Sequence, residues 1–195
     1  MEKNSLLTPV RPLVTLLFIF TILLGVIYPS VIMFINQLAF PSQANGSLIV
    51  EHKFLGSELI GQPFDKPEYF WGRPSATLPE YNPQHSTGSQ LSPANPQLML
   101  NINKRIQKLK RFDSNNSLPI PIDLVCASGS GLDPHISIAA AYYQVPRVAK
   151  SRGIKEEIVY AFVNSAIEYR QFGFLGEPRV NVVKLNLSLY KADRA

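Results

Sequence analysis

A long stretch without charge constrains this chain more than any other feature. From Pro12 to Val50 there is no Asp, Glu, Lys, Arg or His, and the segment Leu13–Ile35 holds 16 Leu, Ile, Val or Phe among its 23 residues. As an α-helix this segment would be about 35 Å long, which is enough to cross a hydrocarbon core of about 30 Å. Its insertion into lipid is worth on the order of −5 to −10 kcal/mol. The sequence therefore predicts one transmembrane anchor, Leu13 through Ile35.

The alternative interpretation of this segment is a cleaved signal peptide. Ser42-Gln43-Ala44 has the small-x-small pattern of a cleavage site. The apolar run is, however, longer than the roughly 7–15 residues of a signal-peptide core. The length of the run favours a retained anchor.

The basic residues that flank the anchor predict its orientation. Lys3 and Arg11 precede it, and no further Lys or Arg follows until Lys53. Positive charge is retained in the cytoplasm, so the amino-terminal side is expected inside and the rest outside. The expected organisation is a cytoplasmic tail with its anchor, residues 1–40, and an extracytoplasmic (periplasmic or extracellular) domain, residues 41–195. A domain of this size can bury a core of its own.

A proline-rich segment lies early in the exported part. Residues 63–96 contain seven prolines, which fix φ and remove backbone donors, so a long helix or a central strand is excluded there. The same segment carries aromatic side chains that a solvated linker would not retain: Tyr69, Phe70, Trp71 and Tyr81. We expect an ordered, irregular loop that these aromatic residues hold against the core.

Regular structure is predicted on both sides of this loop. Extended segments are expected at Ser47–Phe54, Ile120–Ala127 and Val183–Leu189. A first helix is expected on the apolar stripe Leu98, Ile102, Ile106 and Leu109, and a second from Asp133-Pro134 through His135 towards Tyr143. A third is expected over Lys155–Tyr169, where one face is formed by Ile158, Phe162, Ser165 and Tyr169. Few helices and separated strands indicate an α+β domain with a small sheet.

The net charge of +5 arises partly from one basic cluster: Lys104, Arg105, Lys108, Lys110 and Arg111. The cluster falls on the helix with the apolar stripe, so it is expected either as a solvated outer face or as a contact with anionic lipid or an acidic partner. Nucleic acid is excluded as a partner because the domain is placed outside the cell membrane.

The sequence gives little support for nucleotide hydrolysis or metal binding by this chain. It contains no Gly-Lys dipeptide, so a Walker A loop is excluded. The three histidines, His52, His85 and His135, are far apart, and no His or Cys pair has the spacing of zinc ligands. The single cysteine, Cys126, lies in an apolar run and is expected to be a small buried side chain.

The segment Ser128–His135, with the sequence SGSGLDPH, is the most suggestive motif. Ser130, Asp133 and His135 invite a serine-hydrolase interpretation, but Ser128 stands where a nucleophile elbow needs glycine. Asp133 is better placed as a helix cap than as a support for a histidine two residues away. The alternatives are a turn whose amides and hydroxyls form a contact or anion site, and a turn with only a structural role.

Taken together, several blocks resemble the C subunit of the Kdp-type potassium-transporting P-type ATPase. The blocks are residues 69–76, 81–83, 89–96, 122–125, 127–137, 143–145 with 147–149, and 176–182. The run Ser128–Ser137 is highly specific, and with the anchor the resemblance covers nearly the whole chain. Gln90, Ser92, Cys126 and Ile138 depart from the usual residues of the family, which affects fine contacts rather than membership.

The resemblance implies a non-catalytic subunit of an ATP-driven potassium uptake pump in the cell membrane. Its implied partners are a channel-like, potassium-selective subunit and an ATP-hydrolysing subunit, with potassium as the transported ion and ATP entering through the hydrolysing partner. The family is described as a catalytic chaperone that raises the ATP affinity of that partner. A domain outside the membrane cannot reach a cytoplasmic nucleotide, so we expect assembly and stabilisation near the potassium entrance, with nucleotide effects passing indirectly through the anchor.

The residues expected to form a partner-contact or structural loop are Arg73, Pro74, Ser75, Ser128, Gly129, Ser130, Gly131, Asp133 and His135. No catalytic residue, metal ligand or cofactor site is assigned. Two other functions remain open at this point: a membrane-tethered serine hydrolase, and a scaffold of another envelope complex.

Overall fold

The structure, a computed structural model, describes residues 10–51 and 54–193, which divide into two units. The first unit ends at Leu48 and the second begins at Ile49. Lys3 and His52 lie outside the described residues.

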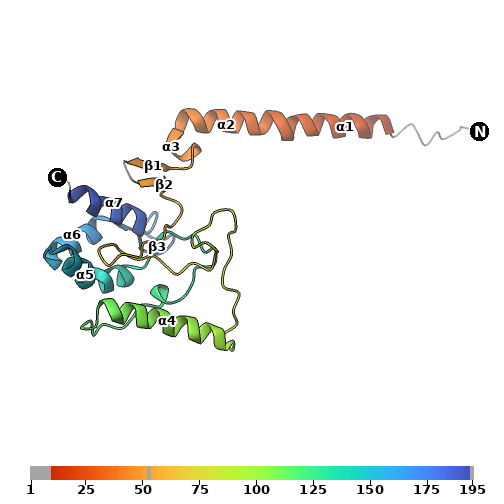
Figure 1. The fold of residues 1–195 in the computed structure, drawn as a ribbon. Coiled ribbons are helices and arrows are strands. Elements are labelled where there is room, and N and C mark those ends of the chain that lie inside the picture. The colour runs from red at the N-terminus through yellow and green to blue at the C-terminus, as the bar shows by residue number, and fades with distance from the viewer. Residues whose placement is uncertain (1–9, 52–53, 194–195) are drawn as a thin grey trace, which may run out of the picture. The chain divides into compact units, whose positions relative to one another are not determined.

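The first unit is a long apolar helix followed by a short turn of helix. It comprises α1 (Val10–Ile22), the π-helical segment η1 (Leu23–Ile27), α2 (Tyr28–Ala39) and α3 (Pro41–Ala44) (Figure 1). From Val10 to Ala39 its large apolar side chains are exposed, and by length and composition the helix can cross a membrane. The predicted anchor helix, Leu13–Ile35, is therefore confirmed as a structural element.

A proline explains the π-helical segment within this helix. Pro29 occupies the first turn of α2, and it has no N–H to donate to the carbonyl of Gly25 four residues earlier. The hydrogen-bond ladder therefore loses its regular partner at that point, and the backbone widens locally into a π turn over Leu23–Ile27.

The second unit combines four helices and two small sheets in the residues that the structure describes. Its elements are β1 (Leu48–Glu51), β2 (Phe54–Ser57), α4 (Pro96–Phe112), the 3₁₀ turn η2 (Ile122–Leu124), β3 (His135–Ile136), α5 (Ile138–Arg152), α6 (Glu156–Ser165), β4 (Ile167–Glu168), β5 (Arg179–Asn181) and α7 (Val182–Ala192). β1 pairs with β2, and a second antiparallel sheet has the order β3-β5-β4. This is the predicted α+β fold with a small sheet.

Strand β5 organises the three-stranded sheet. Val180 lies opposite Ile136 of β3 and opposite Ile167 of β4. Val180 and Ile136 are buried, and Ile167 packs against the same core. The polar neighbours of these residues, His135 of β3 and Glu168 of β4, lie on either side of β5, and their side chains approach one another to 3.7 Å.

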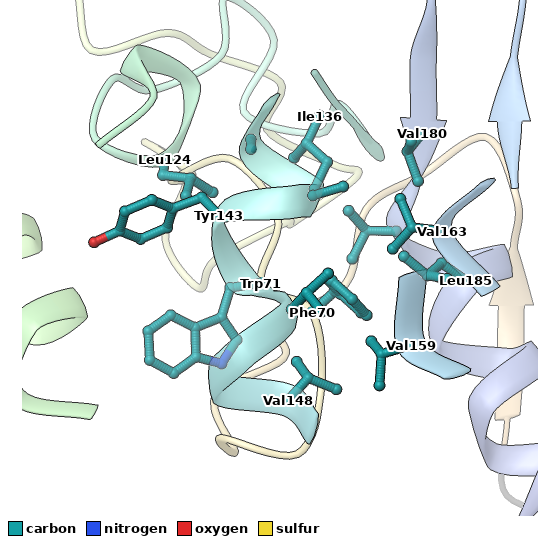
Figure 2. Close-up of a cluster of buried hydrophobic side chains, with 14 of the residues drawn as sticks. Phe70, Trp71, Leu124, Ile136, Tyr143, Val148, Val159, Val163, Val180 and Leu185 are labelled. Atoms are coloured by element: carbon teal, nitrogen blue, oxygen red, sulfur yellow. The ribbon is translucent and has the colours of Figure 1, made fainter. Parts of the chain in front are cut away.

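The core lies around α5, which is buried on most of its surface. Val148 of α5 packs near Val159 and Val163 of α6, Leu185 of α7, and the loop residues Phe70 and Trp71 (Figure 2). The predicted role of the proline-rich segment is confirmed, because no helix or strand occurs between residues 58 and 95 and two of its aromatic side chains belong to the core.

Two buried amides hold the loop at Phe70 and Trp71. The side chain of Asn186 accepts from the Phe70 N–H (2.8 Å) and donates to its carbonyl (2.9 Å). Gln144 does the same for Trp71, at 2.8 and 3.1 Å. Each amide thereby replaces the strand partner that an irregular segment lacks, and satisfies groups that would otherwise be buried without a partner.

A buried arginine adds to this attachment. Arg147, within α5, donates to the carbonyls of Pro67 (2.6 Å) and Tyr69 (3.0 Å), and its guanidinium lies 3.9 Å from the centroid of the Trp71 ring. Burial lowers the pKa of Arg147 to about 10. The guanidinium therefore remains charged at neutral pH. The carbonyl oxygens and the face of the Trp71 ring compensate its buried charge.

The predicted helix start at Asp133-Pro134 is wrong. Helix α5 begins at Ile138, where Ser137 is the cap and accepts from the Ala140 N–H at 3.0 Å. His135 lies in strand β3 instead. The carboxylate of Asp133 accepts a hydrogen bond from the backbone N–H of His135, and this contact forms a local turn before the strand.

The predicted final strand over Val183–Leu189 is also wrong, because this segment is helix α7. Asn181 caps it by accepting from the backbone N–H groups of Val183 (3.0 Å) and Lys184 (3.1 Å). Its buried residues Val182, Val183, Leu185, Asn186 and Leu189 share a helical face. The strict alternation of apolar and polar residues predicted a strand, but the cap and the burial of one helical face show a helix.

Two further predictions are wrong in part. Residues 120–127 form the 3₁₀ turn Ile122–Leu124 rather than a strand, since Pro119 and Pro121 remove ladder donors. The helix predicted over 155–169 ends at Ser165. Its buried residues are Val159 and Val163, each one position after the Ile158 and Phe162 of the predicted face. Ile158 and Tyr169 are exposed.

The remaining helix and the cysteine can be compared with the sequence directly. Helix α4 has the expected stripe, with Leu109 buried and Ile102 and Ile106 packed against the core. Asn95 caps it by accepting from the Gln97 N–H. Cys126 is only partly buried, although it does pack against the core.

Candidate functional site

Two loops far apart in the sequence interlock to form the candidate site. We call residues 72–82 the arginine loop and residues 128–135 the glycine loop. The Ser128 N–H donates to the Pro74 carbonyl (3.3 Å), and the Ser75 hydroxyl donates to the Gly131 carbonyl (2.8 Å). The structure therefore brings both groups of sequence-predicted site residues into one surface of the second unit.

The hydroxyl groups of the arginine loop organise its turn. The Ser75 Oγ accepts from the backbone N–H groups of Thr77 (3.2 Å) and Tyr81 (3.1 Å). Thr77, with only 2% of its surface exposed, donates to the Pro79 carbonyl (2.9 Å) and accepts from the Asn82 N–H (3.0 Å). Thr77 was not among the site residues expected from the sequence, and only its position next to the Arg-Pro-Ser block could have suggested it.

Gly131 fits the glycine loop against its neighbours. Its φ is +68°, in the left-handed region that side chains rarely adopt. A Cβ there would lie 2.7 Å from the Thr87 carbonyl oxygen and 2.8 Å from the Thr77 Cγ2. The glycine is therefore required both by backbone conformation and by the close approach of two other segments.

The polar atoms of Ser130 serve the fold. Its carbonyl accepts from the Thr87 N–H and the Ser86 hydroxyl, both at 3.0 Å, and its Oγ accepts from the Leu132 N–H at 3.1 Å. Within the described part of the chain no hydrogen bond joins Ser130 to His135. The arrangement is thus a braced turn, and it lacks the nucleophile-to-base contact that a serine hydrolase uses.

Asp133 links the two loops through its carboxylate. One oxygen accepts from Arg73 Nη1 (3.2 Å), and the other accepts from the His135 N–H (3.0 Å) and lies 3.2 Å from the His135 Nδ1. Burial alone would raise the pKa of Asp133, but the hydrogen bonds from His135 and the charge of Arg73 outweigh it and hold the pKa below its usual range. Asp133 is therefore ionised and bridges the loops at neutral pH.

The charged network continues across the sheet, which the sequence did not reveal. Glu168 lies 3.7 Å from the His135 Nε2 and receives hydrogen bonds from Arg179 (3.1 Å) and Lys184 (3.3 Å). Lys184 also pairs with Glu58 at 3.1 Å. These residues are scattered in the sequence. The antiparallel register of β3, β5 and β4 brings His135, Glu168 and Arg179 together, and helix α7 adds Lys184.

This network shifts the pKa values of its members. Burial would raise the pKa of Glu168, yet the hydrogen bonds from Arg179 and Lys184 lower it overall. Burial would lower the pKa of Lys184, yet its hydrogen bonds to Glu58 and Glu168 raise it overall. Both groups are held in their charged forms, as expected for a structural ion-pair network.

A small cavity of about 180 Å³ lies beside the arginine loop. Its wall includes Trp71, Tyr81, three cations (Arg73, Arg105 and Lys108) and two carboxylates (Asp65 and Glu80). Lys108 pairs with Asp65 at 2.9 Å, and Arg105 donates to the Val125 carbonyl at 2.6 Å. The Arg73 Nε is a buried donor without an acceptor in the described residues. Most of the charge in this wall is therefore already compensated.

Metal ligands do not converge anywhere in the described residues: no group of three or more His, Cys, Asp or Glu side chains could hold an ion there. Taken together, the interlocked loops form a polar, charge-paired surface whose groups hold one another in place.

Comparison with known proteins adds a clear result. The family model described as "K+-transporting ATPase, c chain" matches residues 10–191. A protein of Methylococcus capsulatus, the "Potassium-transporting ATPase KdpC subunit", is 56% identical over 181 residues, which are 92% of this chain and 95% of that protein. Proteins with the same description in Herpetosiphon aurantiacus and Burkholderia ambifaria are 54% and 52% identical, over 92% and 96% of this chain and 94% and 98% of theirs.

Proposed function

Because this chain belongs to the family of the KdpC subunit of the potassium-transporting ATPase, it is a non-catalytic accessory chain of that complex, and we propose that its folded second unit stabilises the assembly from the extracytoplasmic side. One N-terminal apolar helix anchors it in the membrane, and other subunits of the ATPase are its partners. The proposed partners are the channel-like, potassium-selective subunit and the ATP-hydrolysing subunit. Membership in this family sets aside the serine hydrolase and the scaffold of an unrelated envelope complex.

One observation supports a stabilising role above all others. The Ser, Asp and His that suggested a hydrolase have structural partners: the Ser130 Oγ accepts from the Leu132 N–H within its own turn, and Asp133 bridges Arg73 and His135. Groups that are fixed in this way can present a defined surface to a partner. They are not arranged to carry out a reaction.

The distribution of charge supports the proposed orientation. Arg11 stands at the start of the apolar helix, and the 38 residues that follow it up to Ile49 contain no Lys or Arg. The positive-inside rule then places the second unit outside the cytoplasm. On that side the chain would stand near the potassium entrance of the complex and away from cytoplasmic ATP.

Orientation can be tested with an engineered thiol. In a chain with Cys126→Ala, Ser114→Cys places a cysteine at an exposed position beyond the end of α4. We expect a membrane-impermeant maleimide to label it in intact cells. Asn4→Cys, in the predicted cytoplasmic tail, should label only after lysis. Labelling of Ser114→Cys that requires lysis would place the second unit in the cytoplasm and refute this part of the proposal.

A chaperone-like effect on ATP affinity would then be indirect. A domain on the outer side can alter nucleotide binding only if it changes the balance between states of the hydrolysing subunit, and such coupling is typically worth about 1–3 kcal/mol. The proposed route passes through the anchor helix and through contacts with the channel-like subunit. The free energy would come from differential binding of this chain to those states.

The function as a whole is tested by removing the chain and restoring it. Cells that lack it should lose potassium-stimulated ATPase activity and growth at low potassium, and the wild-type chain should restore both. A tagged chain purified after growth at low potassium should carry the two larger membrane subunits with it. Full activity of the remaining subunits without this chain would contradict an assembly role.

A further inference from the structure

The segment that connects β4 to β5 exposes an unusual amount of aromatic surface. Residues 169–177, which we call the aromatic hairpin, leave Phe172 87%, Tyr169 74% and Phe174 71% exposed, with Leu175 at 47%. Single exposed apolar residues are ordinary, but a group of four on one short hairpin is a typical sign of a binding surface.

The aromatic hairpin has a fixed backbone. Gln171 and Leu175 exchange two backbone hydrogen bonds, each of 2.9 Å. At its base Arg170 makes a two-pronged ion pair with Glu177, at 2.8 and 2.7 Å. The exposed rings therefore stand on a braced turn, and their presentation is preorganised for binding.

The turn residue itself is unexpected on local grounds. Phe172 and Gly173 have φ values of +53° and +82°, which is the combination of a tight hairpin turn that favours Asn-Gly. A phenylalanine is disfavoured in this conformation, and its ring gains nothing from burial here. A strained residue that does not stabilise its own fold indicates a role in contact.

Two features indicate what covers these rings. Nine residues, Phe40 to Leu48, separate the end of α2 from the start of the second unit, and they span at most about 30 Å. The second unit is therefore tethered within reach of the membrane-embedded subunits of the complex. Arg170 and Arg179 are both paired with glutamates of this domain, at 2.7 and 3.1 Å. Their positive charge is neutralised, which favours an apolar protein pocket over an anionic lipid surface.

We propose that the aromatic hairpin inserts Phe172 and Phe174 into an apolar pocket on the extracytoplasmic surface of a membrane-embedded subunit of the same ATPase. The proposal rests on the assembly role and orientation given above. The two rings form the centre of the contact, as aromatic residues commonly do in interfaces, and the Arg170–Glu177 pair forms its polar rim.

The test uses the full chain in its complex. In the double variant Phe172→Asn with Phe174→Ser, asparagine suits the left-handed turn, so the domain should fold at least as well as the wild type. We expect the tagged variant to retain at least tenfold less of the partner subunits in detergent. Met99→Ser and Leu118→Asn, which change apolar residues about half exposed elsewhere, should retain wild-type amounts.

The outcomes separate this inference from the proposed function. If the double variant retains its partners like the two controls, the hairpin contact is refuted while the assembly role stands. If the wild-type chain retains no partner either, the proposed function fails.

A second measurement distinguishes protein from lipid. With Phe174→Trp in the reconstituted complex, we expect a blue-shifted emission that brominated lipid chains do not quench. Strong quenching by bromine would show that the hairpin lies in the bilayer and would overturn the proposal.

Discussion

Replacing Gly131 with valine should lower the free energy of unfolding of the second unit by about 3–5 kcal/mol. The residue adopts φ +68°, where a β-branched side chain is strained, and its Cβ would lie within 2.8 Å of both the Thr87 carbonyl oxygen and the Thr77 Cγ2. The carbonyl belongs to backbone that cannot rotate away. The expected loss is a large fraction of the roughly 5–15 kcal/mol that stabilises a typical domain.

Ser130→Ala is the matched control on the neighbouring residue. It removes one hydroxyl that accepts from the Leu132 N–H, so we expect a loss of about 1 kcal/mol or less. Denaturant unfolding of the full chain in detergent can be followed by the fluorescence of Trp71, the only tryptophan of the chain, which is buried. Partner retention should follow the same order. Equal, mild effects of both changes would contradict the view that backbone shape is what matters in the glycine loop.

Asn186→Leu should destabilise the second unit by about 2–6 kcal/mol, although leucine has the same branched side-chain skeleton as asparagine. The amide of Asn186 is fully buried and satisfies both the N–H and the carbonyl of Phe70. Without the amide, the N–H and the carbonyl of Phe70 are left buried and unpaired, and each lowers the free energy of unfolding by about 1–3 kcal/mol. The loop at Phe70 and Trp71 would then loosen from the core.

The control for this change is Asn103→Leu on the exposed side of α4, which should shift stability by about 0.5 kcal/mol or less. The same fluorescence measurement applies, and Trp71 reports directly on the loop that Asn186 holds. If Asn186→Leu were as mild as Asn103→Leu, the amide pairing would not be what attaches the proline-rich segment to the core.

The anchor, helix α4 and the proline-rich loop were predictable because their signals are local. A charge-free run of apolar residues has one stable environment, and a stripe at helical spacing with Asn95 as cap has one stable conformation. Seven prolines exclude regular structure whatever surrounds them. The family resemblance likewise followed from local blocks, and it is confirmed by a match over residues 10–191.

Helices α5 and α7 show where local signals compete. Asp133-Pro134 is a good helix start, but Asp133 is held by Arg73, 60 residues earlier in the chain, and the helix begins at Ile138 instead, with Ser137 as its cap. Strict alternation over 183–189 predicted a strand. The segment is a helix capped by Asn181, and the importance of Asn186 emerged only when Phe70 was placed against it.

The sequence by itself determined that the chain is anchored by one apolar helix, that it belongs to a non-catalytic family, and which arginine and glycine motifs are candidates for a contact or structural loop. Only the tertiary structure decided that these motifs interlock, that Glu168 and Lys184 extend their charge network, and that a braced hairpin exposes Phe172 and Phe174. The physical reason is the range of the interactions. Transfer of apolar side chains into lipid and backbone restriction by proline are properties of neighbouring residues. Hydrogen bonds and ion pairs between distant segments depend on a register that the whole fold sets.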